Sequence, residues 1–423
     1  MATPDSAAAL PGPEWLRACR LAAAERVAAE PLPSEAEEIW RYSRIGQLDL
    51  DAYTLAAGGD GRWAGGVPRP VQAALAAIGE RSATVVCHHG QVVSVDVDPA
   101  LAARGLAVGD ASRAPDGDHL VGRVAADGDV FSAMNLAFLS GAVSVVVPPG
   151  LVVERPVMVL HWTDADAAAS FPRTIVRAGD DSQVTVIERV LSADVAALVA
   201  PVVGLDVGPA ARVGYVNVQE LGPRVWQIGH QGSKVGRDAT LRSSLVAMGG
   251  DYARVRTDAR IDGQGGSSLL DAVYFTDGQR MHDFRTVQDH AAPSSTSDLL
   301  FKGAVQDQGR SVYSGLIRVR KEAVGTNAFQ TNRNLVLSEG ASAESVPNLE
   351  IETNDVRCSH ASAVGPIDED QLYYLESRGV PPDAAERLIV MGFFGEVLGR
   401  LPVPELVGGL RRSIVERLSR RSS

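Results

Sequence analysis

The chain has few aromatic residues and few cysteines. Aromatic side chains make up 5% of its 423 residues, and the three cysteines, Cys19, Cys87 and Cys358, are far apart and form no CxxC pair. An odd number of widely spaced cysteines argues against a disulfide framework, so we expect a reduced, cytoplasmic protein. Cys19 and Cys87 lie in apolar segments and are expected in the core.

Long apolar runs and common catalytic motifs are also missing. No apolar run approaches the length of a membrane-spanning helix, the N-terminus lacks the apolar stretch of a signal peptide, and we find no GxxxxGK[ST], GxGxxG, GxSxG or HExxH. The net charge is −12, from 40 basic and 52 acidic residues. This acidic balance argues against a nucleic-acid partner or an anionic membrane. Any ATPase activity would have to reside in a partner.

Two helices are predicted near the N-terminus. The first covers 14–29, and its apolar stripe consists of Trp15, Cys19, Ala22, Ala23 and Val27. The second covers 34–44, where Ser34 and Glu37 have the spacing of a capping box. A loop-rich connector then leads to about residue 80.

From about residue 84 the pattern changes to short strands. Segments 85–87 and 91–97 predict a hairpin whose turn contains His88 and His89, and 131–140 predicts one short helix. From 142 to 364, strand-like runs alternate with small-residue turns. The glycines that open three of these turns, Gly179, Gly208 and Gly236, follow one another at almost equal intervals. Such a repeat predicts a right-handed parallel β-helix, with an antiparallel β-sandwich as the alternative.

Helical patterns return after residue 366. Asp368 predicts the start of a helix over 370–377 that ends at Gly379, and a second helix follows from Pro382 to about 401. A last helix places Leu406, Leu410, Ile414 and Leu418 on one stripe. We therefore divide the chain into an N-terminal helical region with a linker (1–80), a β-rich domain (81–365) and a C-terminal helical domain (366–423).

The segment 348–365, NLEIETNDVRCSHASAVG, contains the strongest candidate site. Cys358 and His360 are two residues apart, so on a strand they point to the same side. A thiolate beside an imidazole can bind a soft transition metal or an iron–sulfur centre, but two ligands do not complete a site. The alternative is a packed cysteine next to a hydrogen-bonded histidine.

Other clusters are weaker. Glu350 and Glu352 share a strand face and could serve carbohydrate chemistry, although a solvated strand face is the simpler explanation. In MHDFRTVQDH (281–290), two histidines and two aspartates could hold a metal or could be polar strand partners. The C-terminal aromatics, among them Tyr373, Tyr374 and Phe393, are candidates for an interface.

Several long motifs resemble the SufB/SufD family of iron–sulfur cluster assembly proteins. These are RTVQDHAAPSSTSDLLFKGAVQDQGRSVYSGLIRV, QTNRNLVLS, PNLEIETNDVRCSHASAVG and DEDQLYYLESRGV, in the family order over about 120–400, with EEIWRYS near the N-terminus. SufB members carry a cysteine near the position of Arg333, where this chain has none. The run Cys358–His360 resembles the SufD form.

The resemblance implies a β-helix core that pairs with SufB and a C-terminal domain that binds the ATPase SufC. It places Cys358 and His360 at the SufB interface, where a transient iron–sulfur cluster shared with SufB is built. It implies SufC contacts by Tyr373, Tyr374, Arg378, Gly379, Arg387 and Phe393. Some complexes of the family bind reduced flavin, but nothing in this sequence marks a flavin site.

The resemblance therefore predicts a non-catalytic scaffold, which could pair with itself in isolation. Two other interpretations stay open at this point. One is a β-helix enzyme acting on carbohydrate, for which Glu350 and Glu352 would be the residues to test. The other is a SufB-like paralogue that works as a homodimer.

Overall fold

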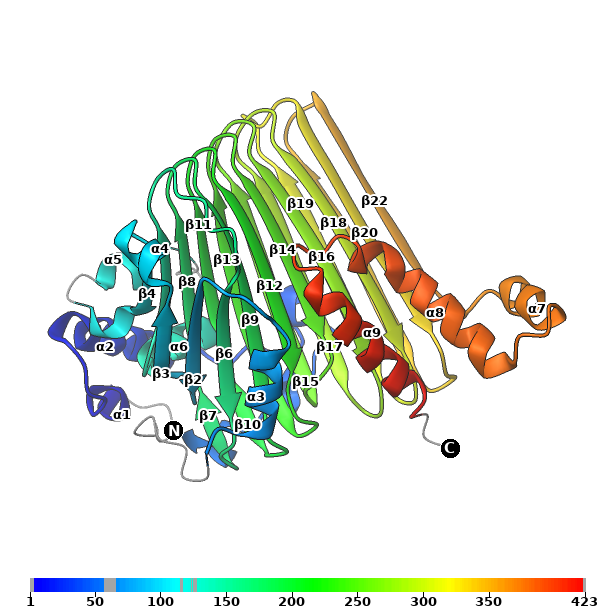
Figure 1. The fold of residues 1–423 in the computed structure, drawn as a ribbon, viewed down its shortest axis with the longest axis horizontal. Coiled ribbons are helices and arrows are strands. Elements are labelled where there is room, and N and C mark those ends of the chain that lie inside the picture. Colours follow the sequence, from blue (N-terminus) through cyan, green and yellow to red (C-terminus); the bar gives the residue numbers. More distant parts are fainter. Residues whose placement is uncertain (1–3, 57–65, 115–116, 123, 125–127, 421–423) are drawn as a thin grey trace.

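The computed structural model describes residues 4–56, 66–114, 117–122, 124 and 128–420. Its centre is a solenoid of parallel strands, with helices at the N-terminal end and along one side (Figure 1). The solenoid confirms the predicted β-helix and excludes the antiparallel sandwich, since every pair of successive coils is parallel. In the described part of the chain, no helix is both long and apolar enough to cross a membrane.

The N-terminal part contains short helices, a hairpin and single strands. The helices are α1 (Pro4–Ala8), α2 (Glu14–Ala29), α3 (Arg69–Ala76), α4 (Pro99–Ala103), α5 (Asp118–Val121) and α6 (Val130–Ala137), with 3-10 turns η1 (Glu38–Trp40), η2 (Ile45–Gln47), η3 (Leu50–Ala52) and η4 (Ala111–Arg113). The strands are β1 (Thr54–Leu55), β2 (Ala83–His88), β3 (Gln91–Val97) and β4 (Ala107–Asp110). The predicted hairpin is the antiparallel pair β2–β3, and the helix predicted at 131–140 is α6.

The helix predicted over 34–44 is wrong, because this segment forms only the 3-10 turn η1. Glu37 does accept a hydrogen bond from the Ser34 backbone N–H (2.9 Å), as in the predicted capping box. The backbone carbonyls of the segment are used elsewhere, however: Arg254 donates to the carbonyl of Ile39 and Arg285 to that of Arg41. Contacts with the sheet thus replace the helical hydrogen bonds.

The buried face of α2 also differs from the predicted stripe. Ala22 is exposed, and Cys19 is only half-buried. The buried residues are Leu16, Arg20, Ala23, Ala24 and Val27. Arg20 belongs to this face because its guanidinium donates to three backbone carbonyls, those of Leu10, Pro11 and Leu139.

The coils place their strands alternately in two sheets. One sheet contains β5 (Val143–Val147), β8 (Arg173–Ala178), β11 (Val202–Val207), β13 (Val225–Val235), β15 (Tyr252–Ile261), β17 (Met281–His290), β19 (Arg310–Val319) and β21 (Ser342–Ile351). The other contains β6 (Val157–Thr163), β9 (Gln183–Ser192), β12 (Arg212–Glu220), β14 (Thr240–Ala247), β16 (Ser267–Thr276), β18 (Thr296–Val305), β20 (Thr326–Val336) and β22 (Val356–Gly365). Two short strands, β7 (Ala168–Ser170) and β10 (Ala197–Val199), extend the first sheet.

The predicted glycines lie at one corner of successive coils. Gly208 donates to the carbonyl of Ala178 and Gly236 to that of Val207, each at 2.9 Å. A Cβ on Gly208 would lie 2.7 Å from the Ala178 oxygen, so the stacked backbones require glycine here. Two residues after each predicted glycine the backbone is left-handed, at Asp181, Ala210 and Asp238. The almost equal intervals between the glycines thus reflect coils of nearly constant length.

The core changes character along the solenoid. Between the two sheets of the early coils it is mainly valine, leucine and alanine, including Val159, Val186 and Leu205. In later coils, amides, hydroxyls and tyrosines occupy inward positions, among them Gln288 and Asn332. The apolar part supplies the bulk of the hydrophobic stabilisation.

Three helices complete the C-terminal part: α7 (Glu369–Ser377), α8 (Pro382–Leu398) and α9 (Glu405–Leu418). The Asp368 side chain accepts from the N–H groups of Asp370 and Gln371, as predicted for a cap. Helices α8 and α9 cover the outer face of the sheet that contains β16 and β18, whereas α7 projects away from the solenoid (Figure 1). The predicted stripe of α9 is buried in full.

Candidate functional site

The solenoid ends without a cover over its last coil. Within the described residues, β21 pairs only with β19 and β22 only with β20. Leu349, Ile351 and Val364 are 37%, 42% and 44% exposed. We call this uncovered coil, made of β21 and β22, the open end.

Cys358 and His360 lie on β22 and face the inside of the solenoid. The register pairs Cys358 with Ala328 and His360 with Gln330, and both partners are buried inward residues of β20. Ser362, two residues further, bonds across the interior to Ser345 of β21 (2.7 Å between the hydroxyl oxygens). The two candidate ligands therefore share one face of the strand, in the cross-section that no further coil covers.

The environment of Cys358 keeps its thiol protonated in the isolated chain. Burial raises the pKa of the Cys358 thiol above its ordinary value. A thiolate is the form that binds metal, so the thiol becomes a ligand only when a metal displaces its proton or a cationic group approaches. His360 is exposed and can donate or accept a hydrogen bond or bind a metal.

A polar layer lies directly behind these residues. Asn332 donates to the Tyr274 hydroxyl (3.0 Å), which in turn donates to Asn334 (2.6 Å). The amide of Gln330, next to His360, is buried and has no hydrogen-bond partner among the residues described. In the sequence, the polar residues at alternate positions of QTNRN (330–334) indicate this inward polar layer, because alternate residues of a strand share a face.

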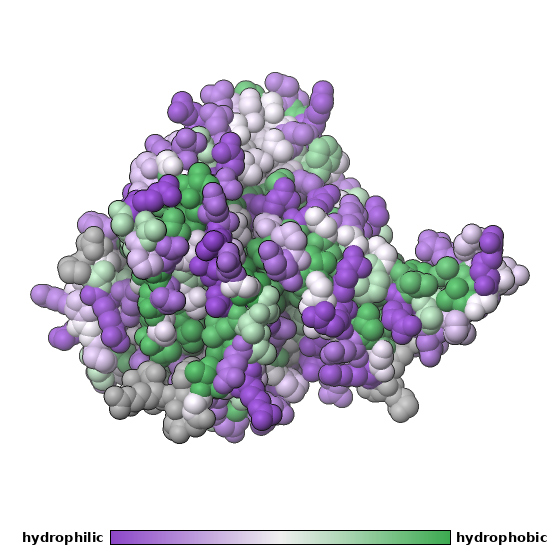
Figure 2. All heavy atoms as spheres, in the orientation of Figure 1, coloured by the Kyte–Doolittle hydropathy of each residue, from purple (hydrophilic) through white to green (hydrophobic). Residues whose placement is uncertain are grey.

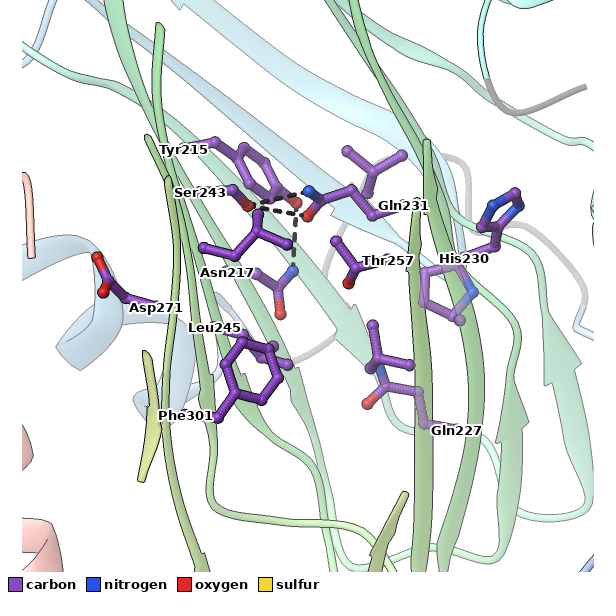
Figure 3. A pocket seen from close by; sticks show the side chains of 15 residues that line it. Tyr215, Asn217, Gln227, His230, Gln231, Ser243, Leu245, Thr257, Asp271 and Phe301 are labelled. Atoms are coloured by element: carbon purple, nitrogen blue, oxygen red, sulfur yellow. Dashed lines mark hydrogen bonds between the residues drawn. The ribbon is translucent and has the colours of Figure 1, made fainter. Parts of the chain in front are cut away.

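Further inside, the polar positions leave a small space (Figure 3). Gln231 and Ser243 bond to each other (2.9 Å), and Asn217 donates to the Tyr215 hydroxyl (3.4 Å). The volume of this space is about 30 Å³, which suits water.

The structure separates the residues of the 281–290 cluster. His282 and His290 face inward, whereas Asp283 lies on the opposite face of β17, where it binds Arg254 and Arg285. His282 is held by Thr276 and the Gly249 carbonyl, and His290 by two serine hydroxyls. Burial lowers the pKa of each histidine to about 4. These histidines are neutral core residues.

The carboxylate pair on β21 lies outside the coil. Glu350 accepts a hydrogen bond from Arg318 on the neighbouring strand (2.9 Å), and the two side chains are 46% and 38% exposed. Glu352 and Asp355 are exposed as well. This arrangement is that of solvated charges on a strand surface.

One buried cluster was not predicted from the sequence. His161 Nε2 lies 2.7 Å from Glu188 Oε1, inside the early coils, and Thr174 and Tyr215 donate to the same carboxylate. Burial by itself lowers the pKa of His161, but Cys87 and Glu188 raise it to about 10. Cys87 is fully buried, as predicted. Local sequence carries no signal for this cluster, because its members come from different strands and are far apart in the chain.

A family model matches the coils that carry these residues. Residues 161–393, more than half of the chain, match the model described as SUF system FeS cluster assembly, SufBD core domain. The chain belongs to the SufBD family.

Several SufBD proteins are similar to this chain over about 70% of its length. The iron–sulfur cluster assembly SufBD family protein Rv1462 of Mycobacterium tuberculosis is 35% identical over 310 residues, which are 71% of this chain and 77% of that protein. SufD of Bacillus subtilis is 29% identical (70% and 68% covered), and SufD of Escherichia coli is 26% identical (69% and 70% covered). This SufBD chain is SufD-like, as its motifs predicted.

The C-terminal residues that the family resemblance predicts as SufC contacts lie in two different environments. Tyr373 and Tyr374 on α7 are 73% and 57% exposed, and the Arg378 guanidinium lies 5.1 Å from the centre of the Tyr374 ring. Figure 2 shows apolar surface where α7 meets α8. Phe393 instead faces the solenoid, with Lys302 Nζ 4.9 Å from its ring centre.

Arg387 is exposed on α8, and Gly379 has a φ of +83° directly after α7. The turn at Gly379 separates α7 from α8 and lets α7 point away from the sheet. Leu388 of α8 is 55% exposed, although it is apolar.

Proposed function

We propose that this SufD-like chain is a non-catalytic, cytoplasmic scaffold subunit of an iron–sulfur cluster assembly complex. It pairs with SufB through the open end and binds the ATPase SufC through α7 and the adjoining part of α8. The observation that carries this proposal is the open end itself, where two uncovered strands meet next to Cys358 and His360.

The open end is a surface that requires a partner. The outer edges of β21 and β22 offer backbone N–H and C=O groups that lack a neighbouring strand among the described residues. Apolar side chains that other coils would bury, such as Leu349 and Val364, are exposed between them. A second solenoid that adds its own strands here would satisfy both needs.

The cargo at this interface is a nascent iron–sulfur cluster. Cys358 and His360 supply a sulfur and a nitrogen donor on one strand face, and iron in such clusters requires more ligands than two. The remaining ligands come from SufB across the interface. The proposal thus explains why two isolated donors lie in an uncovered cross-section.

SufC binding would affect the open end through the strands beneath α8. Lys302 of β18 contacts Glu396 (2.7 Å), and Asp298 of the same strand accepts from Arg400 (2.8 Å). Strand β18 pairs with β20, and β20 pairs with β22. A displacement of α8 by nucleotide-driven motion of SufC therefore has a short, packed path to Cys358 and His360.

Co-expression with SufB and SufC, followed by native mass spectrometry, tests the proposal. We expect a species with one copy of this chain, one SufB and two SufC. Leu349→Asp with Val364→Asp should abolish SufB pairing and preserve SufC binding, because buried unpaired charges are costly at an interface. Tyr373→Ala with Tyr374→Ala should do the reverse, so each variant is the folding control of the other.

The same complexes test the site. Cys358→Ser with His360→Ala should reduce cluster formation, measured by visible absorption, without changing the mass of the complex. A chain that stays a monomer or homodimer in the presence of both partners would contradict the scaffold proposal. Unchanged cluster formation in the double variant would contradict the site assignment alone.

A further inference from the structure

A second group of potential ligands lies at the other end of the solenoid. His88 and His89 lie at the end of the β2–β3 hairpin, and Asp164 directly follows β6. One ligand atom from each residue lies within 4.8 Å of the other two. Seven strands, from β6 to β20, separate β2 from β22 in the sheet, so this group is remote from Cys358 and His360.

The hairpin turn brings the two histidine rings together. Consecutive residues of a strand normally point to opposite faces. His89 and Gly90 have φ values of +50° and +84°, which form a two-residue hairpin turn. The ring centres of His88 and His89 are consequently 4.1 Å apart.

Both rings point at one oxygen of Asp164. The Nε2 atoms of His88 and His89 lie 2.7 and 3.0 Å from Asp164 Oδ1. The other carboxylate oxygen accepts a hydrogen bond from the Trp162 indole N–H (2.9 Å). Metal-binding carboxylates are typically fixed by such an outer partner, and Trp162 is itself buried.

The distances suit a metal ion in place of the two imidazole protons. Zinc bonds of about 2.0–2.2 Å place neighbouring ligand atoms of a tetrahedral site about 3.3 Å apart. The observed separations of 2.7 and 3.0 Å approach this value, so small side-chain rotations suffice. The side chains of His88 and Asp164 are 18% and 35% exposed, which leaves access for an ion and a water ligand.

The donor types suit a divalent transition metal. Two imidazole nitrogens and one carboxylate oxygen form a donor set for divalent zinc or iron.

We infer that His88, His89 and Asp164 form an open binding site for one divalent transition-metal ion, Zn²⁺ or Fe²⁺, with water in the remaining position. The site is independent of the proposed scaffold role. It is distinct from the proposed cluster ligands at the open end.

Calorimetric titration of the isolated full chain with Zn²⁺, and with Co²⁺ as a spectroscopic substitute, tests the inference. A background of Cys358→Ser and His360→Ala removes the donors at the open end. We expect one ion per chain and an affinity at least about 100-fold lower after Asp164→Asn. Trp162→Phe, which removes the outer hydrogen bond and keeps an aromatic ring, should lower the affinity about 10–100-fold.

The matched control is His119→Ala, which removes an exposed histidine (side chain 79% exposed) elsewhere on the surface and should leave binding unchanged. Thermal unfolding shows whether each variant is folded, and His88→Ala replaces Asp164→Asn if that variant is not. No binding by the background protein would overturn the inference. Equal binding by the background protein and the Asp164→Asn or His88→Ala variant would overturn it as well.

Discussion

The buried pair of His161 and Glu188 shows how one charged contact is tolerated between the sheets. Both side chains are at most 3% exposed. Burial raises the pKa of Glu188, but hydrogen bonds from His161, Thr174 and Tyr215 more than offset this and lower it below its ordinary value. The carboxylate is stable only because each of these donors is present.

We expect Glu188→Gln to lower the free energy of unfolding by about 3–5 kcal/mol at pH 6, since it leaves the imidazolium of His161 buried without its counter-charge. Denaturant unfolding measures this effect. Glu154→Gln, at an exposed position, is the control and should change the stability by less than about 0.5 kcal/mol. Equal stability of the two variants would contradict the account of the pair.

The pH dependence of this effect has a defined sign. The His161 contribution is complete below its ordinary pKa of 6.5 and is lost as the pH rises towards about 10. The Glu188 contribution is complete above 4.5 and is lost as the pH falls through its lower folded pKa. The difference between wild type and Glu188→Gln should therefore be largest between pH 4.5 and 6.5 and should shrink towards pH 10.

At the scale of single residues, sequence reasoning worked where the partners are neighbours in the chain. The spacing of Cys358 and His360 was enough to place them on one strand face, because the period of a strand is two. The spacing could not place Asp164 beside His88 and His89. That contact depends on a hairpin turn and on the parallel pairing of β2 with β6, two strands that are far apart in the sequence.

At the scale of the element, the corner glycines set the spacing of the coils. Gly263 lies in the turn between β15 and β16, one coil after Gly236. A Cβ on Gly263 would lie 2.0 Å from the backbone nitrogen of Arg237, much closer than real Cβ contacts. The neighbouring atoms belong to the backbone, so they cannot rotate away.

Gly263→Ala should therefore destabilise the protein by about 1–3 kcal/mol, the usual cost of overpacking, with a lower Tm in calorimetry. Gly79→Ala is the matched control, because a Cβ there meets nothing within 4 Å and its φ is not in the left-handed region. Unchanged stability for Gly263→Ala would show that the corner can expand.

The repeat of glycines made the coils predictable, but the short helices were less so. Helix α3 lies in a segment that composition alone indicated as a loop. Its Val71 and Ala74 pack against the outer face of the sheet, in the same cluster as Ile187 and Leu191 of β9. Such a short helix is marginal by itself and is stabilised by this packing, which local sequence does not reveal.

At the scale of the whole molecule, polar contacts fasten the C-terminal helices to the solenoid. Lys302 is buried, donates to the Phe393 carbonyl (3.0 Å) and pairs with Glu396. At the far end of α9, Arg417 pairs with Asp277 of the solenoid (3.2 Å). These contacts let the helices and the sheet move together.

Lys302→Met should lower the free energy of local opening of α8 by about 1–3 kcal/mol, because it removes charged hydrogen bonds and leaves a carbonyl without its donor. Hydrogen exchange followed by mass spectrometry would show faster exchange in α8, with β9 and β12 unchanged. Arg224→Met, which removes an exposed ion pair with Asp194, serves as the control. Equal protection of α8 in both variants would contradict the proposed coupling.

The two ends of the solenoid differ in the direction of their edge strands. The first coils border antiparallel strands, β3 against β2 and β4 against β5, whereas the last coil ends in strands parallel to their neighbours. A body that continued the parallel pairing at the last coil would therefore find a differently directed edge at the other end. End-to-end stacking of copies of this chain would not repeat the pairing between its coils.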